Sequence, residues 1–151
     1  MSVISVNFCW LEPETSRDLP LPTYHSELAA GMDVAAAVTD PVVIGPGEIQ
    51  LIPTGFAVAI PPGYELQVRP RSGLAVKHGI SIINSPGTID ADYRGEVKIA
   101  LINLGRVPFT IRRQDRIAQL VLAPVSRAVL LVLEQLDKTS RQDGGFGHTG
   151  M

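Results

Sequence analysis

The sequence predicts an all-β protein, built as a sandwich or barrel with one short helix and a flexible, glycine-rich arm at its C-terminus. Twelve prolines and fourteen glycines in 151 residues leave little room for long helices, because proline blocks a helix interior and glycine weakens it. Short β-prone runs alternate with turn signals, a pattern typical of all-β folds. The clearest turn signals are Gly45-Pro46-Gly47, Pro61-Pro62-Gly63, Ser85-Pro86-Gly87 and Leu104-Gly105.

Alternating side chains indicate two strands in the middle of the chain. Tyr64 to Arg69 alternates in character, and so does Glu96 to Leu101. In the second run Glu96 and Lys98 point away from the face that carries the aliphatic side chains. The face expected to be buried consists of Val97, Ile99 and Leu101.

Two other segments have helical character. Ser72 to His78 follows a proline and begins with a possible serine cap, so we predict a short helix there. Gln114 to Ala123 places Ile117, Leu120 and Val121 at helical spacing, yet it is equally apolar as a strand. We predict a strand for this segment.

Length and composition indicate one domain with one hydrophobic core. The chain has 151 residues, of which 45% are hydrophobic. We place the core domain at residues 1–133, which end in the apolar run Ala128 to Leu133. Residues 134–151 are polar and glycine-rich and cannot pack a core, so we predict an arm that becomes ordered over a ligand.

Charge, cysteine content and hydropathy exclude several classes of protein. A net charge of −2 and a pI near 5.9 provide no basic field for DNA or RNA, although a small anion could bind locally. The single cysteine, Cys9, excludes a disulfide framework, and we expect it to be buried. Because the chain has neither a signal-like N-terminus nor an apolar stretch of spanning length, we expect a soluble, cytoplasmic protein without membrane contact. The mean hydropathy of +0.19 suggests apolar surface shared with a partner subunit.

Common catalytic signatures are absent from the sequence. It contains no P-loop, no GxSxG nucleophile elbow, no HExxH and no CxxC, and its three histidines lack metal-ligand spacing. The candidate binding groups are instead four polar clusters, two in loops between strands, one in the last predicted strand and one in the arm.

The first cluster is Pro70-Arg71-Ser72-Gly73, at the start of the predicted helix. A guanidinium, a hydroxyl and a glycine backbone at a helix start can hold phosphate oxygens. A capped turn with a solvated arginine explains the same residues, and on spacing alone it is the better explanation.

The second cluster, Asn84 to Gly95, contains an amide, two carboxylates and an aromatic ring between apolar strands. Asp90 follows the apolar Ile89 and is expected near the phosphate loop, so it could reach a water molecule, stay ionised and act as a general base. The alternatives are turn capping by Asp90 and Asp92 and core packing of Tyr93.

The remaining clusters are a glutamine in the last predicted strand and the arm. Gln119 interrupts an apolar run and could orient a water molecule, but a solvent-facing side chain explains it equally. In the arm, Phe146 lies between Gly145 and Gly147, so ring and backbone can approach a flat ligand, and Arg141 can meet phosphate. A disordered terminus is the alternative, but it would need no phenylalanine.

In this order, the clusters resemble the five motifs of the trimeric dUTPase family. The first motif is Ala30 to Ala36 and the last is the glycine-rich arm, so the match runs from about residue 20 to the C-terminus. Gly87 to Gly95 matches its motif nearly intact. The arm departs from the family at Gln142, Asp143 and His148, and we expect Asp143 to face solvent because it would otherwise repel a triphosphate.

The resemblance implies an enzyme, a dUTP diphosphatase that hydrolyses dUTP to dUMP and pyrophosphate with Mg²⁺. Such an enzyme limits uracil incorporation into DNA and supplies dUMP for dTMP synthesis. The family's fold is a jelly-roll-like β structure that forms a homotrimer. Each site contains residues of more than one subunit and is closed by the arm of a neighbouring subunit.

The resemblance also implies the catalytic residues. Asp90 activates the water that attacks the α-phosphorus, and Gln119 helps to place that water. Asp33 lies in the outer shell of the magnesium ion, bound through water, or frames the site. Arg116 is structural or an interface residue.

Substrate contacts follow from the same resemblance. The residues that recognise uracil are Asn84, Gly87, Thr88 and Ile89. Tyr93 lies under the deoxyribose and leaves no room for a ribose 2′-hydroxyl. The residues that hold phosphates are Arg71, Ser72 and Gly73. The arm residues that contact the nucleotide are Arg141, Phe146 and Gly147.

Two other functions compete with this one. A dCTP deaminase of the same fold needs a catalytic glutamate in the strand after the aspartate loop, where this chain has Ala100. A non-catalytic trimer that senses dUTP or regulates a partner would use the same pocket without hydrolysis.

Overall fold

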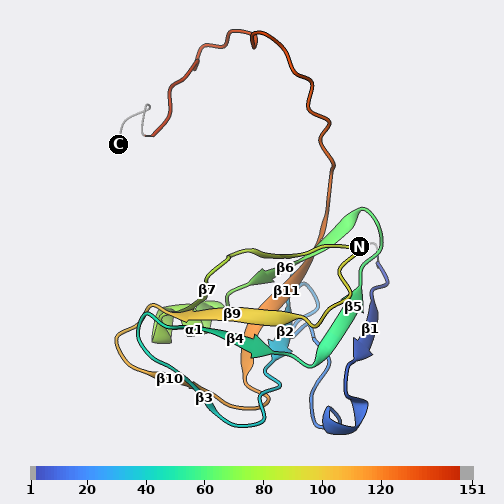
Figure 1. The fold of residues 1–151 in the computed structure, drawn as a ribbon, viewed down its shortest axis with the longest axis vertical. Helices are drawn as coiled ribbons and strands as arrows, with labels where there is room; N and C mark the ends of the chain where they lie inside the picture. Colours follow the sequence, from blue (N-terminus) through green and yellow to red (C-terminus); the bar gives the residue numbers. More distant parts are fainter. Residues whose placement is uncertain (1–2, 147–151) are drawn as a thin grey trace.

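The computed structural model describes residues 3–146 (Figure 1). Within this range the chain forms strands connected by turns, with the short helix α1 (Ser72–His78) and the 3-10 turn η1 (Pro13–Thr15). The strands are β1 (Asn7–Trp10), β2 (Met32–Ala35), β3 (Val42–Ile44), β4 (Ile49–Pro53), β5 (Phe56–Ala59), β6 (Tyr64–Arg69), β7 (Ile80–Ile82), β8 (Gly87–Ile89), β9 (Lys98–Asn103), β10 (Phe109–Ile111) and β11 (Arg116–Pro124).

The strands pair antiparallel in several small sheets. The larger sheets have the orders β2–β11–β6–β8 and β4–β9–β7, and the pairs β1–β5 and β3–β10 complete the fold. In the described part of the chain these sheets do not close into a continuous barrel. The predicted all-β class is therefore confirmed, in the form of a sandwich.

The core lies between the sheets and is made of aliphatic side chains on alternate strand positions. Leu66, Val68 and Leu120 supply it from one sheet. Val97, Ile99 and Leu101 are fully buried, so the predicted inward face of that segment is confirmed. The strand itself begins two residues later than the alternation indicated, at Lys98.

The short helix has the predicted bounds but not the predicted cap. Ser72 is its first helical residue, and the N-cap is Arg71, which makes no side-chain cap hydrogen bond. The serine cap was therefore wrong, because the helix begins at Ser72 itself, one residue earlier than a cap at Ser72 requires. The helix ends at His78 and is capped by Gly79, whose φ of 69° is left-handed and whose N–H donates to the Ala75 carbonyl.

The ambiguous segment 114–123 forms a strand, as predicted, but the strand begins at Arg116 and ends at Pro124. β11 pairs with β2 on one side and β6 on the other, so ladder hydrogen bonds extend along both of its edges. This central place in the sheet decides against the helix that the spacing also allowed. No helix of the described chain has the length and apolar character needed to cross a membrane.

Cys9 is exposed, which corrects the expectation of a buried residue. Side chains alternate along β1, and its inward positions are Phe8 and Trp10. Both rings pack on Phe56, with centroid distances of 4.8 and 6.0 Å. The cysteine therefore takes the outward face, since the aromatic residues have the larger apolar surface.

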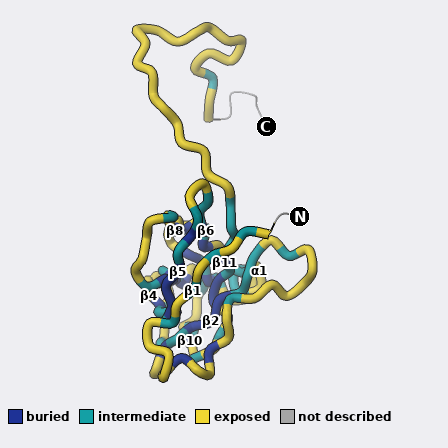
Figure 2. The backbone as a smooth tube through the Cα atoms, turned by 90° about the vertical axis from the view of Figure 1, so that its right-hand side faces the viewer, coloured by how far each residue is buried: buried dark blue, intermediate teal, exposed yellow. Residues whose placement is uncertain are grey.

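After Pro124 the described chain leaves the sandwich and extends away from it (Figure 1), with no further strand or helix up to residue 146. Nearly all of this segment is exposed (Figure 2), including the apolar side chains of Val129 to Leu133. Asp143 is exposed in this extended arm, and its orientation relative to a bound triphosphate stays a prediction.

An ion pair joins the N-terminal segment to the turn before β11. The Arg113 guanidinium donates to both carboxylate oxygens of Asp18, from Nε to Oδ2 at 2.7 Å and from Nη2 to Oδ1 at 2.8 Å. Gln114 Nε2 also donates to Asp18 Oδ2, at 3.1 Å. Arg113 also donates to the Thr15 carbonyl. The hydrogen bond from Arg113, and then that from Gln114, holds the pKa of Asp18 well below its ordinary value of 3.8.

We expect Asp18→Asn to be less stable than the wild type at neutral pH, with a difference that shrinks as the pH falls below 3.8. The folded-state pKa is the lower one, so the ion pair stabilises the folded chain above the ordinary carboxyl pKa and ceases to do so as Asp18 is protonated. Urea unfolding at several pH values measures this difference. The control is Asp40→Asn, an exposed aspartate. Equal pH dependence for both variants would contradict the prediction.

Candidate active site

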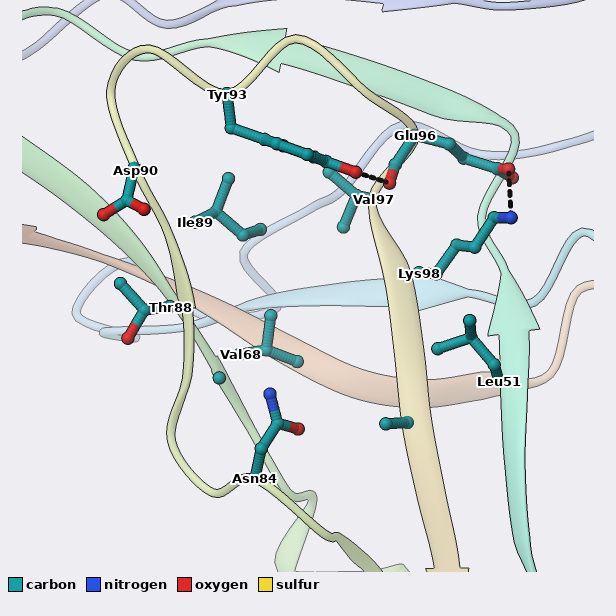
Figure 3. A pocket seen from close by; sticks show the side chains of 12 residues that line it. Leu51, Val68, Asn84, Thr88, Ile89, Asp90, Tyr93, Glu96, Val97 and Lys98 are labelled. Atoms are coloured by element: carbon teal, nitrogen blue, oxygen red, sulfur yellow. Dashed lines mark hydrogen bonds and ion pairs between the residues drawn. The ribbon is translucent and has the colours of Figure 1, made fainter.

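A pocket of about 310 Å³ lies between the hairpin loop 84–93 and strands β4 and β9 (Figure 3). It brings together six residues that the sequence marked as candidates, namely Asn84, Gly87, Thr88, Ile89, Asp90 and Tyr93. The remaining lining consists of Leu51, Val68, Glu96, Val97, Lys98 and Ala100. The arrangement combines apolar walls with a few polar groups, as is usual for a small-molecule site.

The pairing of β8 with β6 positions the loop residues. Gly87 lies opposite Val68, and a Cβ on Gly87 would be 3.1 Å from the Val68 Cβ, so glycine permits this close approach. Ile89 is buried and anchors the end of β8. Asp90 follows directly and is exposed at the mouth of the pocket (Figure 3). Its carboxylate is thus open to a water molecule and a substrate.

Tyr93 extends from the same loop across the pocket (Figure 3). The Asp90 carbonyl accepts a hydrogen bond from the Tyr93 N–H at 3.1 Å, which closes the turn. The phenol hydroxyl donates to the Glu96 carbonyl oxygen at 3.0 Å. Tyr93 is 45% exposed, so the alternative in which its ring packs in the core is wrong.

A second group of polar side chains gathers around Asp33. Its Oδ2 lies 3.2 Å from an Arg71 nitrogen, 3.2 Å from Arg116 Nη1 and 3.5 Å from His25 Nε2. Arg71 also donates to the Arg116 carbonyl at 2.9 Å. Asp33 thereby orients Arg71 and ties Arg116 into the sheet.

Gln119 belongs to this second group. It lies opposite Asp33 of β2 and opposite Arg69 of β6 in the sheet, so all three side chains share its outer face. Its Nε2 donates to the Pro70 carbonyl at 2.9 Å. A Cβ on Gly31 would lie 2.2 Å from Gln119 Oε1, so glycine at position 31 leaves the room that the amide occupies.

Several predicted residues are not part of the 310 Å³ pocket. Its lining contains none of Asp33, Arg71, Ser72, Gly73 and Gln119. Ser72 and Gly73 are exposed at the start of α1. One copy of the chain thus presents the hairpin pocket and, beside it, the polar group around Asp33. Gln119 of that group lines another pocket together with Ser85 and Pro86 of the hairpin loop.

The arm residues lie apart from both groups. Arg141 Nε donates to the Gly144 carbonyl at 2.7 Å, within the arm itself, and Phe146 is fully exposed. Gly147 and His148 fall outside the described residues. The predicted contacts of the arm with a nucleotide therefore stay predictions.

Glu96 and Lys98 also line the pocket, although the sequence did not mark them as candidates. Lys98 Nζ lies 3.6 Å from Glu96 Oε2, at the side of the pocket opposite Asp90 (Figure 3). The alternation had placed both side chains away from the core, and the face opposite a core is where a pocket can form. Both residues lie close to Tyr93 in the sequence, and this closeness was the signal that could have identified them as pocket residues.

Comparison with known proteins identifies relatives along nearly the whole chain. A family model described as dUTPase matches residues 17–150. The deoxyuridine 5′-triphosphate nucleotidohydrolase of Desulfotalea psychrophila is 62% identical over 146 residues, which cover 97% of each chain. That of Caldanaerobacter subterraneus subsp. tengcongensis is 56% identical over 138 residues, covering 91% of this chain and 93% of the relative.

Solved structures agree with these relatives. Staphylococcus bacteriophage 80alpha dUTPase with dUPNHPP has a TM-score of 0.82 at 27% identity, covering 97% of this chain and 99% of that one. A point variant of the dUTPase from phage phi11 of S. aureus, described with a structural Mg(II) ion, has a TM-score of 0.77 at 26% identity, covering 89% and 99%.

Proposed function

This chain belongs to the dUTPase family, and we propose that it hydrolyses dUTP to dUMP and pyrophosphate through a water molecule activated by Asp90. The family model and the curated relatives support the reaction. The observation that carries the assignment of Asp90 is its exposed carboxylate at the mouth of the hairpin pocket. A general base must reach water and the reacting phosphorus, and this place satisfies that requirement.

Recognition of the nucleoside belongs to the hairpin pocket in this proposal. Asn84 and the backbone of β8 bind the uracil edge, so cytosine is rejected by its hydrogen-bond pattern and thymine by its methyl group. Polar groups left unpaired by a wrong base make such selectivity large. Tyr93 lies under the deoxyribose and excludes a 2′-hydroxyl.

Phosphate binding belongs to the second group. The Arg71 guanidinium, held by Asp33, offers paired donors for phosphate oxygens, together with Ser72 and the Gly73 backbone. Gln119 places the attacking water. These groups do not line the pocket of the same chain, which supports a site assembled from two subunits.

Magnesium is part of the proposal as the cofactor. Within the described residues no three histidine, cysteine or acidic side chains lie close enough to hold a metal ion together. Mg²⁺ prefers oxygen ligands and keeps several water molecules, so triphosphate oxygens and water would supply most of its ligands. Asp33 would lie in the outer shell of the ion. Its contacts with Arg71, Arg116 and His25 all involve Oδ2, so they leave Oδ1 for a water molecule bound to the ion. When bound, the ion neutralises charge on the triphosphate.

We propose a homotrimer in which residues 134–151 of one subunit close the site of a neighbour. The exposed apolar run Val129 to Leu133 supports this assembly, because five consecutive aliphatic side chains in water would be unfavourable. In the proposed arrangement Phe146 stacks on uracil and Arg141 reaches the terminal phosphate. The cytoplasm, where nucleotide pools are maintained, is the proposed location.

Deamination of dCTP is the weaker alternative. Ala100 lines the hairpin pocket, so the position where a related deaminase carries its catalytic glutamate holds a methyl group. A methyl group cannot transfer protons between water and a base.

The proposed function is tested by measuring pyrophosphate release from dUTP, UTP, dTTP and dCTP with magnesium. We expect rapid release from dUTP and little from the others, because the pocket selects both base and sugar. Ammonia release from dCTP would support the deaminase instead. Sedimentation of the same sample should show a trimer, and a monomer with full activity would contradict the shared site.

A further inference from the structure

The Tyr93 ring keeps its place without being buried. It is 45% exposed, and its hydroxyl donates to the Glu96 carbonyl oxygen at 3.0 Å. The far end of the ring also rests on Gly95, where an added Cβ would lie 2.5 Å from the hydroxyl oxygen and 2.7 Å from Cζ. The position of the ring therefore depends on the backbone at Gly95 and Glu96.

Hydrogen bonds within the sandwich hold the peptide group between Glu96 and Val97 on the side that faces away from Tyr93. The Val97 N–H donates to the Phe56 carbonyl at 2.9 Å, and Val97 and Phe56 are both buried. The Glu96 carbonyl belongs to the same planar peptide and points away from that N–H, toward the Tyr93 hydroxyl. The buried Thr54 hydroxyl donates to the next carbonyl, that of Val97.

The Glu96 side chain adds another connection to the turn between β4 and β5. Its Oε1 accepts a hydrogen bond from the Gly55 N–H at 3.0 Å. Its Oε2 lies 3.6 Å from Lys98 Nζ (Figure 3). The carboxylate is 22% exposed, so it is partly shielded from solvent. Glu96 thus links the framework of the sandwich to the ring that crosses the pocket.

We infer that Glu96 is a positioning residue that sets the selectivity for deoxyribose over ribose by fixing the place of Tyr93. The inference rests on the proposed function, in which Tyr93 lies under the sugar. A displaced ring no longer excludes a 2′-hydroxyl. Glu96 acts on the sugar through the tyrosine, so its loss affects the choice of nucleotide more than the chemical step.

The test compares kcat/KM for dUTP and UTP in Glu96→Ala and Glu96→Gln. In the alanine variant we expect the ratio of kcat/KM for dUTP to that for UTP to fall by roughly 3- to 10-fold, the factor that corresponds to one hydrogen bond. The glutamine variant should keep nearly the wild-type ratio, because its amide oxygen still accepts from Gly55. Should the alanine variant fail to fold, Glu96→Asp, whose carboxylate is one methylene shorter, serves in its place.

A double-mutant cycle separates this role from a merely structural one. In a Tyr93→Phe background the hydroxyl contact is already lost, so Glu96→Ala should change the ratio little further. An unchanged ratio in the folded single variant, or a full additional loss in the Tyr93→Phe background, would overturn the inference. A wild type that does not cleave dUTP would contradict the proposed function itself, whereas a selective wild type with an equally selective Glu96→Ala contradicts only the role of Glu96.

Discussion

Asp90→Asn is expected to lower kcat for dUTP by about 10²- to 10⁴-fold, the range attributed to a general base. Asparagine keeps the size and most of the polarity of the side chain but cannot take a proton from water at neutral pH. The carboxylate is exposed at the end of β8, so the substitution disturbs no buried contact. Pyrophosphate release measures the loss, and calorimetry with a non-hydrolysable dUTP analogue should show retained binding.

The matched control is Asp92→Asn, an exposed aspartate of the same loop that does not line the hairpin pocket. It should keep kcat within about three-fold, a change of less than 1 kcal/mol. Equal losses in both variants would indicate a general effect of loop charge. An inactive wild type that still binds dUTP would favour the sensing trimer over the enzyme.

Deleting residues 141–151 should leave a folded trimer whose turnover of dUTP falls by about 10²-fold or more. In the proposed arrangement the arm excludes water and brings Phe146 and Arg141 to the nucleotide, and loss of such positioning has effects of that size. Folding should be unaffected, because residues 141–146 are almost entirely exposed in the described chain and pack on no core. Steady-state kinetics and sedimentation measure the two properties separately.

Removing only residues 149–151 provides the control for this deletion, because it leaves Arg141 and Phe146 in place. Its turnover should stay close to that of the full chain. Undiminished turnover after the longer deletion would contradict closure of the site by the arm. Loss of the trimer after that deletion would show that the arm holds the subunits together.

Three strands, β6, β9 and β11, and the helix followed from local patterns. Alternation in segments 64–69 and 96–101 predicted β6 and the buried face of β9, since side chains of a strand point to opposite sides in turn. The bounds of α1 were correct as well. Its cap was not, because a shift of one residue at a helix start changes little in the sequence pattern.

The pocket was predicted only in part. The six candidates from Asn84 to Tyr93 lie together because they belong to one hairpin, where closeness in sequence means closeness in space. Glu96 was missed, because its significance depends on the Gly55 N–H, which is 41 residues away. Asp33 was named as a site residue, but its ion pairs with Arg71 and Arg116 could not be predicted, because they join β2 to distant segments.

By itself, the sequence determined the all-β class, the hairpin with its aspartate and tyrosine, and the family, because these depend on neighbouring residues and on motifs in order. Tertiary structure alone decided that Cys9 is exposed, that Arg71 is held by Asp33, and that Tyr93 rests on Gly95 and the Glu96 carbonyl. The physical reason is that periodicity distinguishes the two faces of a segment, whereas the partner of each face depends on how distant strands pack. The packing of the sandwich therefore decides which side chains meet in the site.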